Sequence, residues 1–252
     1  MRIDKFLSEK YGSRTKAAEA VIKKLVIVNG KTVSPSYNVK PGDDIQFIEA
    51  EENFVSAGGF KLSKALKDFG YSPQDKIFAD IGASTGGFTD CLLQNGAKKV
   101  YCIDVGESQL DKRLNKENVV VIDNYNAREL NKGLFSEVLD GAVIDVSFIS
   151  LTYILGGVSK VLDEGATVIA LIKPQFECEN RKVGKNGIVK DPKIHEAVIR
   201  KIYDFAISCG LQPQKITNAP IVRGKNLEYL IMLCKSSNVK SEIEYLLKSV
   251  KL

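Results

Sequence analysis

The chain has 252 residues, of which 44% are hydrophobic and 27% are charged. This balance is typical of soluble globular proteins and excludes disordered, collagen-like and coiled-coil chains. No apolar run approaches the roughly 18 residues of a membrane-spanning helix, and the first residues lack the apolar core of a signal peptide. The five cysteines form no Cys-x-x-Cys pair, so we expect neither a zinc site nor a disulfide framework, and we expect a cytoplasmic location.

Charge is distributed unevenly along the chain. Residues 1–40 hold nine Lys or Arg and three Asp or Glu, whereas residues 41–60 hold no basic residue and five acidic ones. Residues 61–172 hold 12 basic and 15 acidic residues, and residues 173–252 hold 15 and 8. Basic ends around an acidic centre suggest that the chain binds a polyanion, although solvated surface charge explains many imbalances of this kind.

The first fifty residues predict a small α+β unit. Apolar residues recur at helical spacing over 3–7, and Ser13 is a good N-cap for a second helix. Apolar residues on both sides of Asn29-Gly30 are typical of a tight hairpin, and a further strand is expected at 45–48. An acidic stretch then leads into a linker at about residues 49–57. We therefore predict two domains, residues 1–56 and residues 57–252.

Short motifs in this unit resemble the S-four-type RNA-binding domain. They are Arg2-x-Asp4-Lys5-Phe6-Leu7, Ser13-Arg14-x-x-Ala17, Val26-x-Val28-Asn29-Gly30 and Val39-x-Pro41-Gly42-Asp43. One departure is Lys24-Leu25, where the family usually places a glycine. The resemblance implies contacts to RNA phosphates, which position RNA without reading its sequence; a basic surface on a protein-interaction domain is the alternative. The residues expected to contact RNA here are Arg2, Lys5, Ser13, Arg14, Lys16, Lys23 and Lys24.

From residue 58 onward, apolar runs alternate with helical stretches. Strands are expected at 77–79, 100–103, 119–122, 142–144, 167–172 and 227–233, and helices at 89–95, 109–114, 150–162 and 195–209. This alternation predicts an α/β fold with a parallel, doubly wound, Rossmann-like sheet. Ligands bind such sheets beyond the carboxyl ends of the strands, so the residues that follow each strand are candidates for a site.

A glycine loop follows the first of these strands. Residues 80–89 read Asp-Ile-Gly-Ala-Ser-Thr-Gly-Gly-Phe-Thr, and Asp104 follows the second strand, where an acidic residue can bind the ribose hydroxyls of an adenosine cofactor. Asp123 closes the third strand and could approach the adenine. The cofactor could be a dinucleotide or S-adenosylmethionine. Ser84 at the second-glycine position disfavours a pyrophosphate, and Asp80 suits a cationic sulfonium, so we predict S-adenosylmethionine.

Asp145 and Lys173 directly follow the fourth and fifth strands. Either residue alone is more often a helix cap or a salt-bridge partner, but together they favour a catalytic site. The chain lacks the Pro-Pro-Tyr segment of amino methyltransferases and the Pro-Cys of cytosine carbon-5 enzymes, which leaves an oxygen as the methyl acceptor. A ribose 2′-hydroxyl is a poor nucleophile, and a lysine can serve as its base if burial and a nearby cation lower the lysine pKa.

Motifs along nearly the whole chain resemble the TlyA family, in which an S-four-type domain precedes an FtsJ-like ribose methyltransferase and which is often named hemolysin. They are Ala57-Gly-Gly-Phe-Lys-Leu62, the glycine loop 80–90, Asp104-Val-Gly106, Asn126-Ala-Arg128, Ile144-Asp-Val-Ser-Phe-Ile-Ser150, Lys173-Pro-Gln-Phe-Glu177, Gly184-Lys-Asn-Gly-Ile-Val189 and Asn226-Leu-Glu228. One departure is Ala57, where the family commonly has arginine.

The resemblance implies a catalytic Lys-Asp-Lys-Glu tetrad at Lys61, Asp145, Lys173 and Glu228. By themselves, Lys61 would be read as an exposed helix lysine and Glu228 as a charge at a strand end. The expected cofactor-binding residues are Asp80, Gly82, Ala83, Ser84, Thr85, Gly86, Gly87, Asp104, Val105 and Asp123, and further RNA contacts are expected from Lys182 and Lys185.

The resemblance also implies ribosomal RNA or ribosomal subunits as partners. The predicted activity is S-adenosylmethionine-dependent methylation of cytidine 2′-oxygens in ribosomal RNA. Two alternatives are a non-catalytic RNA-binding factor for ribosome assembly and a membrane-lytic protein of the hemolysin type. The sequence shows no apolar span or strongly basic amphipathic helix that would support lysis.

Overall fold

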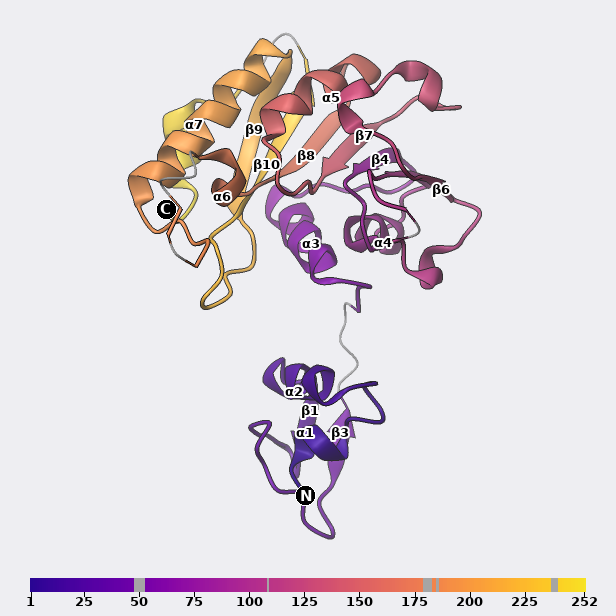
Figure 1. Cartoon of the computed structure of the whole chain (residues 1–252), viewed down its shortest axis with the longest axis vertical. Coiled ribbons are helices and arrows are strands. Elements are labelled where there is room, and N and C mark those ends of the chain that lie inside the picture. The colour runs from indigo at the N-terminus through magenta and orange to yellow at the C-terminus, as the bar shows by residue number, and fades with distance from the viewer. Residues whose placement is uncertain (48–52, 108, 179–182, 185, 237–239) are drawn as a thin grey trace. The chain divides into compact units, whose positions relative to one another are not determined.

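The computed structural model describes residues 1–47, 53–107, 109–178, 183–184, 186–236 and 240–252. The chain divides into two units of different size, Met1–Asn53 and Phe54–Leu252 (Figure 1). The domain boundary predicted at residues 56 and 57 stays a prediction.

The N-terminal unit is a small α+β structure. It contains α1 (Ile3–Phe6), α2 (Arg14–Ile22), β1 (Val26–Val28), β2 (Lys31–Thr32) and β3 (Ile45–Phe47), and its antiparallel sheet has the order β2-β1-β3. The Ser13 hydroxyl accepts a hydrogen bond from the Lys16 backbone N–H at 3.2 Å and thereby caps α2, as predicted. The predicted hairpin is also confirmed, because Val28 pairs with Lys31 across Asn29-Gly30.

Lys24, two residues beyond the last residue of α2, has a left-handed conformation with φ at +59°. A residue just beyond a helix commonly adopts this conformation, and glycine is preferred there because it has no Cβ to strain. This preference explains why the family usually has a glycine near this position. In this chain Lys24 adopts the same left-handed conformation, so the turn still forms.

The larger unit is a three-layer α/β structure. Its sheet has the order β6-β5-β4-β7-β8-β10-β9. The strands are β4 (Ile77–Ile81), β5 (Lys99–Ile103), β6 (Val119–Ile122), β7 (Gly141–Ile144), β8 (Thr167–Ile172), β9 (Leu211–Asn218) and β10 (Tyr229–Lys235). The α-helices are α3 (Ala57–Phe69), α4 (Gly87–Gln94), α5 (Leu155–Val161), α6 (Pro174–Glu177), α7 (Pro192–Ser208) and α8 (Ile243–Lys248). Short 3-10 helices are η1 (Lys112–Leu114), η2 (Ala127–Glu129), η3 (Lys132–Leu134) and η4 (Leu151–Tyr153).

Helices cover both faces of this sheet (Figure 1). Apolar residues of α3 and α4, such as Leu62 and Leu92, pack with Phe78 and Val100 on one face. Those of α5 and α7 pack with β7 and β8 on the other face. The predicted α/β fold with a doubly wound sheet is thus confirmed.

The last two strands differ from the predicted parallel arrangement. β10 is antiparallel to both β8 and β9, and β9 was not predicted. Parallel neighbours need a crossover of a dozen or more residues, usually helical, whereas only residues 219–228 connect β9 to β10 and they contain no helix. The chain therefore crosses through α7 to β9 and returns as β10 between β9 and β8. The helix expected over 150–162 is also divided, into η4 and α5.

Candidate active site

Three of the predicted catalytic residues lie together at the end of the sheet where the parallel strands finish, which is called here the carboxyl edge. Ile144 at the end of β7 pairs with Ala170 of β8, and Ile172 at the end of β8 pairs with Tyr229 at the start of β10. Asp145 and Lys173 follow their strands, while Glu228 precedes its strand. The antiparallel direction of β10 is what brings Glu228 to this edge.

Two lysine–carboxylate pairs form there. Lys173 Nζ lies 2.5 Å from Asp145 Oδ1 and donates a hydrogen bond of 2.8 Å to Ser147 Oγ. Lys61 Nζ, on α3, donates to Glu228 Oε2 at 2.7 Å. The Lys173 side chain is only 10% exposed, and the other three are between 15% and 25% exposed. In all four residues the charge is therefore partly shielded from water, which strengthens each pair.

Helix α3 is held close to the glycine loop. A Cβ at Gly87, the first residue of α4, would lie 2.9 Å from the backbone nitrogen of Gly59 in α3. Glycine at 87 thus permits the two helices to approach, and this contact fixes the start of the helix that carries Lys61. Gln175, in α6, donates to the other oxygen of Glu228 at 3.1 Å and so links the two pairs through the segment after Lys173.

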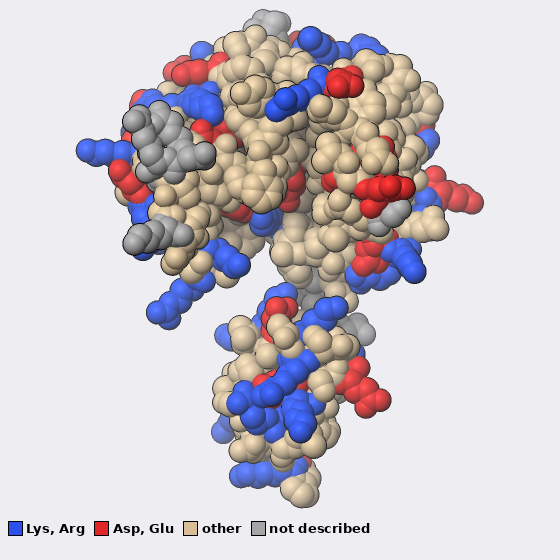
Figure 2. All heavy atoms as spheres, viewed as in Figure 1, with Lys and Arg blue, Asp and Glu red and all other residues tan. Residues whose placement is uncertain are grey.

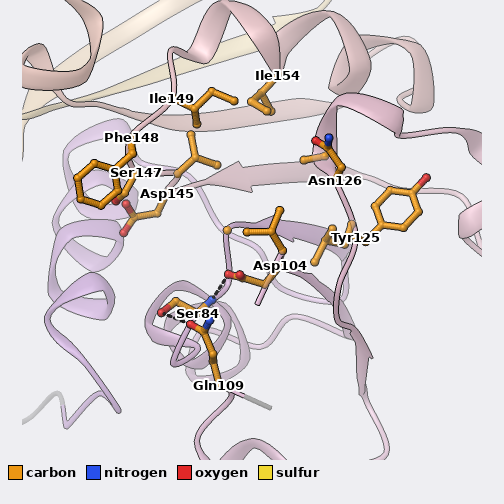
Figure 3. Close-up of a pocket in the computed structure, with 15 residues that line it drawn as sticks. Ser84, Asp104, Gln109, Tyr125, Asn126, Asp145, Ser147, Phe148, Ile149 and Ile154 are labelled. Carbon is orange, nitrogen blue, oxygen red and sulfur yellow. Dashed lines mark hydrogen bonds between the residues drawn. The ribbon is translucent and has the colours of Figure 1, made fainter. Parts of the chain in front are cut away.

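A cavity of about 390 Å³ lies beyond the carboxyl ends of β4, β5 and β7 (Figure 3). Asp104 lines it, and its two carboxylate oxygens accept hydrogen bonds of 2.8 Å from the backbone N–H groups of Ser84 and Gly106. These bonds hold the carboxylate at the cavity wall with lone pairs still available. Apolar groups of Val105 and Ile149 line the same space, so the cavity combines a fixed anion with apolar walls.

A second cavity of about 160 Å³ contains a buried carboxylate. Asp80 lines it together with Lys173 and residues of the glycine loop. Asp80 Oδ2 accepts from the backbone N–H and the hydroxyl of Thr89, at 2.9 and 2.6 Å. Asp80 Oδ1 is buried and has no hydrogen-bond partner among the residues that the structure describes. Burial raises the pKa of Asp80 to about 7, and the charges of Asp145 and Asp104 add to this effect against the hydrogen bonds from Thr89.

An unpaired buried carboxylate oxygen fits a cationic group. S-adenosylmethionine carries a sulfonium and an amino group, and its adenosine has ribose hydroxyls that suit Asp104 and a ring that suits apolar walls. Two adjoining cavities, one with Asp104 and one with Asp80, therefore match the two halves of this molecule in charge and polarity. The cofactor predicted from the sequence fits the residues present.

Most of the expected cofactor residues line these cavities. They are Asp80, Gly82, Ala83, Ser84, Thr85, Gly87, Asp104 and Val105, whereas Gly86 and Asp123 are not among the lining residues. The prediction did not include several other lining residues: Gln109, Tyr125, Asn126, Ser147 and Phe148. Asn126 and Ser147 lie within the family motifs and could have been found from them. Nothing in the local sequence of Gln109 or Tyr125 marks them.

The basic residues predicted to contact RNA are exposed on the N-terminal unit. Arg2, Lys5, Arg14, Lys16, Lys23 and Lys24 all face solvent, and Figure 2 shows Lys and Arg covering much of the visible face of this unit. Buried Asp4 binds Arg2 through both carboxylate oxygens and also accepts from Arg14 Nε at 3.2 Å. Burial would raise the pKa of Asp4, but the hydrogen bonds from Arg2 and Arg14 outweigh it and lower the pKa. The predicted contacts Lys182 and Lys185 lie outside the described residues.

Comparison with known proteins agrees with this architecture. Residues 54–236 match the family described as FtsJ-like methyltransferase, and residues 1–45 match the S4 domain. The chain is 43% identical to hemolysin A of Brachyspira hyodysenteriae, over 91% of this chain and 98% of that protein. It is 34% identical to the 16S/23S rRNA (cytidine-2′-O)-methyltransferase TlyA of Mycobacterium tuberculosis, over 88% and 84%.

A solved structure named as a hemolysin, from Streptococcus thermophilus, superposes with a TM-score of 0.75 at 38% identity and covers 98% of this chain and 94% of its own. The family match extends over most of the chain, and the relatives are similar along nearly their full lengths. The chain therefore belongs to the TlyA family, as an FtsJ-like methyltransferase that carries an S4 domain before its catalytic unit.

Proposed function

We propose that this methyltransferase transfers a methyl group to the 2′-hydroxyl of a cytidine in ribosomal RNA. The observation that carries the proposal is the pair of shielded lysine–carboxylate contacts, Lys61 with Glu228 and Lys173 with Asp145, beside the two cavities. An oxygen acceptor needs proton removal, which these lysines can assist. The nucleotide and the kind of RNA are taken from the printed names of relatives at 32–34% identity.

The cofactor of this enzyme is S-adenosylmethionine, whose sulfonium supplies an electrophilic methyl group. We assign Asp104 to its ribose hydroxyls and Asp80 to its cationic amino-acid end, because each carboxylate lines the cavity of matching chemistry. The glycine loop brings backbone N–H groups to the same place.

Lys173 is assigned as the acceptor of the 2′-hydroxyl proton. Its ammonium, once formed, is stabilised by Asp145 at 2.5 Å and by the Ser147 hydroxyl at 2.8 Å. Lys61 is assigned to orient the ribose, with Glu228 and Gln175 fixing its position. In this role Lys173 enters the step as a neutral amine and leaves it as an ammonium.

Phe148 supports a nucleic-acid substrate. It is 89% exposed, lies on the wall of the larger cavity and packs against Phe176 with ring centroids 4.8 Å apart. An exposed aromatic face next to the reacting groups suits stacking of a base turned out of its helix. The basic N-terminal unit would contribute contacts to RNA phosphates.

We also propose that the enzyme acts in the cytoplasm. None of the five cysteines forms a disulfide in the described structure, which fits a reducing compartment, and ribosomal RNA is the proposed substrate. In the described part of the chain, no helix combines the length and apolar character needed to cross a membrane.

The decisive experiment uses ribosomal RNA and ribosomal subunits from a strain that lacks the gene. Incubation with the purified protein and S-adenosylmethionine should create 2′-O-methylcytidine at a defined position, as mapped by resistance to alkaline cleavage. Binding of RNA without methylation would favour the assembly-factor alternative. Leakage of dye from liposomes in the absence of methylation would favour the lytic one.

Replacing Asp104 by alanine is expected to weaken S-adenosylmethionine binding by about 1.5–3 kcal/mol, because hydrogen bonds to a charged acceptor are lost. Isothermal titration calorimetry measures the change. Asp163→Ala is the control, since Asp163 pairs with Lys132 and lines neither of the two cavities. Equal effects of the two substitutions would remove Asp104 from the cofactor site.

The raised pKa of Asp80 should make the free energy of unfolding depend on pH. Its pKa is raised to about 7 from 3.8, so between these values the folded protein binds more protons than the unfolded chain, and the contribution of Asp80 to stability falls as pH rises. Without cofactor, Asp80→Asn should therefore raise the free energy of unfolding at pH 8 by about 2–4 kcal/mol, and by much less at pH 5. Urea unfolding at both pH values measures this difference.

The same substitution should weaken S-adenosylmethionine binding at pH 8, because an amide carries no charge to attract a cation. In the unsubstituted protein, affinity should fall as pH drops through about 7. A variant that is more stable at pH 8 yet binds the cofactor normally would show that the buried carboxylate has no part in binding.

A further inference from the structure

We propose that Glu177 is a positioning residue of the active site, which locks the segment that carries Asp145 onto the segment that carries Lys173. This inference rests on the proposed methyl transfer. Glu177 is the last residue of α6, four positions after Lys173, and its side chain is 2% exposed. A buried carboxylate needs partners for its charge, and those of Glu177 lie on the other segment and on α7.

Three donors converge on this carboxylate. Oε1 accepts from the backbone N–H of Leu151 at 2.7 Å, and Oε2 accepts from the hydroxyl of Ser150 at 2.6 Å. Oε2 also accepts from Lys201 Nζ, on α7, at 2.9 Å, and Lys201 donates a second bond to the Glu177 backbone carbonyl at 2.9 Å. The carboxylate thus caps the first turn of η4 and ties it to α6 and α7.

This contact is the last of three that join residues 145–151 to residues 173–177. The first is the Lys173 contact with Asp145 and Ser147, and the second is the packing of Phe176 against Phe148. Glu177 makes the third, at the far end from the strands. Chain connectivity at the end of β7 and the Glu177 contact therefore hold the loop between them at both ends.

The loop needs such an anchor because it contains a strained residue. Phe148 has φ at +62°, a left-handed conformation that is rare for a bulky residue, and its ring is 89% exposed. Strained residues of this kind persist only where the surroundings fix them. The anchor at Ser150 and Leu151 resists relaxation of Phe148, and so keeps Ser147 and Asp145 in contact with Lys173.

A carboxylate performs this task better than an amide. All three donors require an acceptor, and an ionised carboxylate offers only acceptor sites. In Glu177→Gln, the NH₂ group would face one of these donors, so one contact would be lost and Lys201 would lose its counter-charge. Displacements of about 1 Å near reacting groups can cost about 100-fold in rate.

The test measures single-turnover methyl transfer to ribosomal RNA with saturating RNA and S-adenosylmethionine, together with the thermal midpoint. Glu177→Gln should slow transfer by about 10- to 100-fold. The matched control is Glu137→Gln. Glu137 also pairs with a lysine, Lys99, and accepts from Tyr101, but Lys99 begins β5 and so lies at the opposite edge of the sheet. A smaller loss of midpoint with a near-normal rate is expected for this control, because the Glu137 side chain is 31% exposed.

A second variant separates positioning from general stability. Glu177→Gln combined with Lys201→Gln removes the uncompensated lysine charge and should recover much of the lost midpoint, while transfer remains slow because the Leu151 and Ser150 contacts are still impaired. Recovery of rate together with midpoint, or an equal rate loss in Glu137→Gln, would overturn the inference. Absence of methylation by the unsubstituted protein would instead overturn the proposed function.

Discussion

Replacing Lys173 by alanine is expected to slow methyl transfer by about 10²–10⁴-fold, which is the usual contribution of a general base. Lys173 is the most deeply buried residue of the tetrad, and its Nζ atom contacts Asp145 and Ser147. The substitution keeps Asp80, Asp104 and the N-terminal unit, so both ligands should still bind, and titration with S-adenosylmethionine checks this because Lys173 lines the smaller cavity. Single-turnover kinetics at saturating ligand concentrations measures the chemical step, and Lys160→Ala on the exposed face of α5 is the control.

Lys173→Arg should fail as well, because a guanidinium stays protonated and cannot accept a proton. This variant keeps a positive charge opposite Asp145. Lys173→Arg should therefore lose less stability than Lys173→Ala, relative to the unsubstituted protein. A near-normal rate in the arginine variant would show that position 173 needs only positive charge, and would make Lys173 an electrostatic support instead of the base.

Reversing three charges on the N-terminal unit should weaken RNA binding by about 10²–10³-fold at low salt. The variant is Lys16→Glu, Lys23→Glu and Lys24→Glu; Arg14 is left in place because it also binds the buried Asp4. With fewer phosphate contacts, RNA binding releases fewer counterions. The slope of log K against log salt should therefore become less negative by about 2–3. Filter binding across a salt series measures both quantities.

Cofactor affinity should stay unchanged in this triple variant, since the cofactor cavities lie in the other unit. The matched control reverses Lys116, Lys160 and Lys248, three exposed lysines of the larger unit, and changes the net charge by the same amount. If the two triple variants lose RNA affinity equally, overall charge and not the N-terminal surface governs binding.

Sequence patterns alone predicted much of the fold. The capping serine and the Asn29-Gly30 hairpin are local signals that were confirmed, as was the alternation of strands with helices. The helix expected at 109–114 was wrong, because only the 3-10 helix η1 forms there. The glycine loop with Asp104 after the next strand also follows from local order along the chain. Such features are predictable because a short stretch of residues determines them through backbone preference and hydrophobic period.

The antiparallel strand pair at the end of the sheet was not predictable in the same way. β9 contains Pro213 and lies at the edge of the sheet, where the pattern of burial is weak, and β10 gives no local sign of its direction. The direction of β10 depends on the length of its connection to β9 and on the free position beside β8. Both are properties of the assembled sheet.

The strand pattern predicts that an Asp and a Lys directly follow strands, and the family motifs add Lys61 and Glu228. Which lysine meets which carboxylate depends on the packed fold: Lys61 of α3 pairs with Glu228 from 167 positions away, because α3 packs beside the antiparallel β10. Likewise, only folding makes Glu177 a buried acceptor for Ser150 and Leu151. The physical reason is that strand and helix signals act over a few residues, whereas charge pairing depends on distances that packing alone sets.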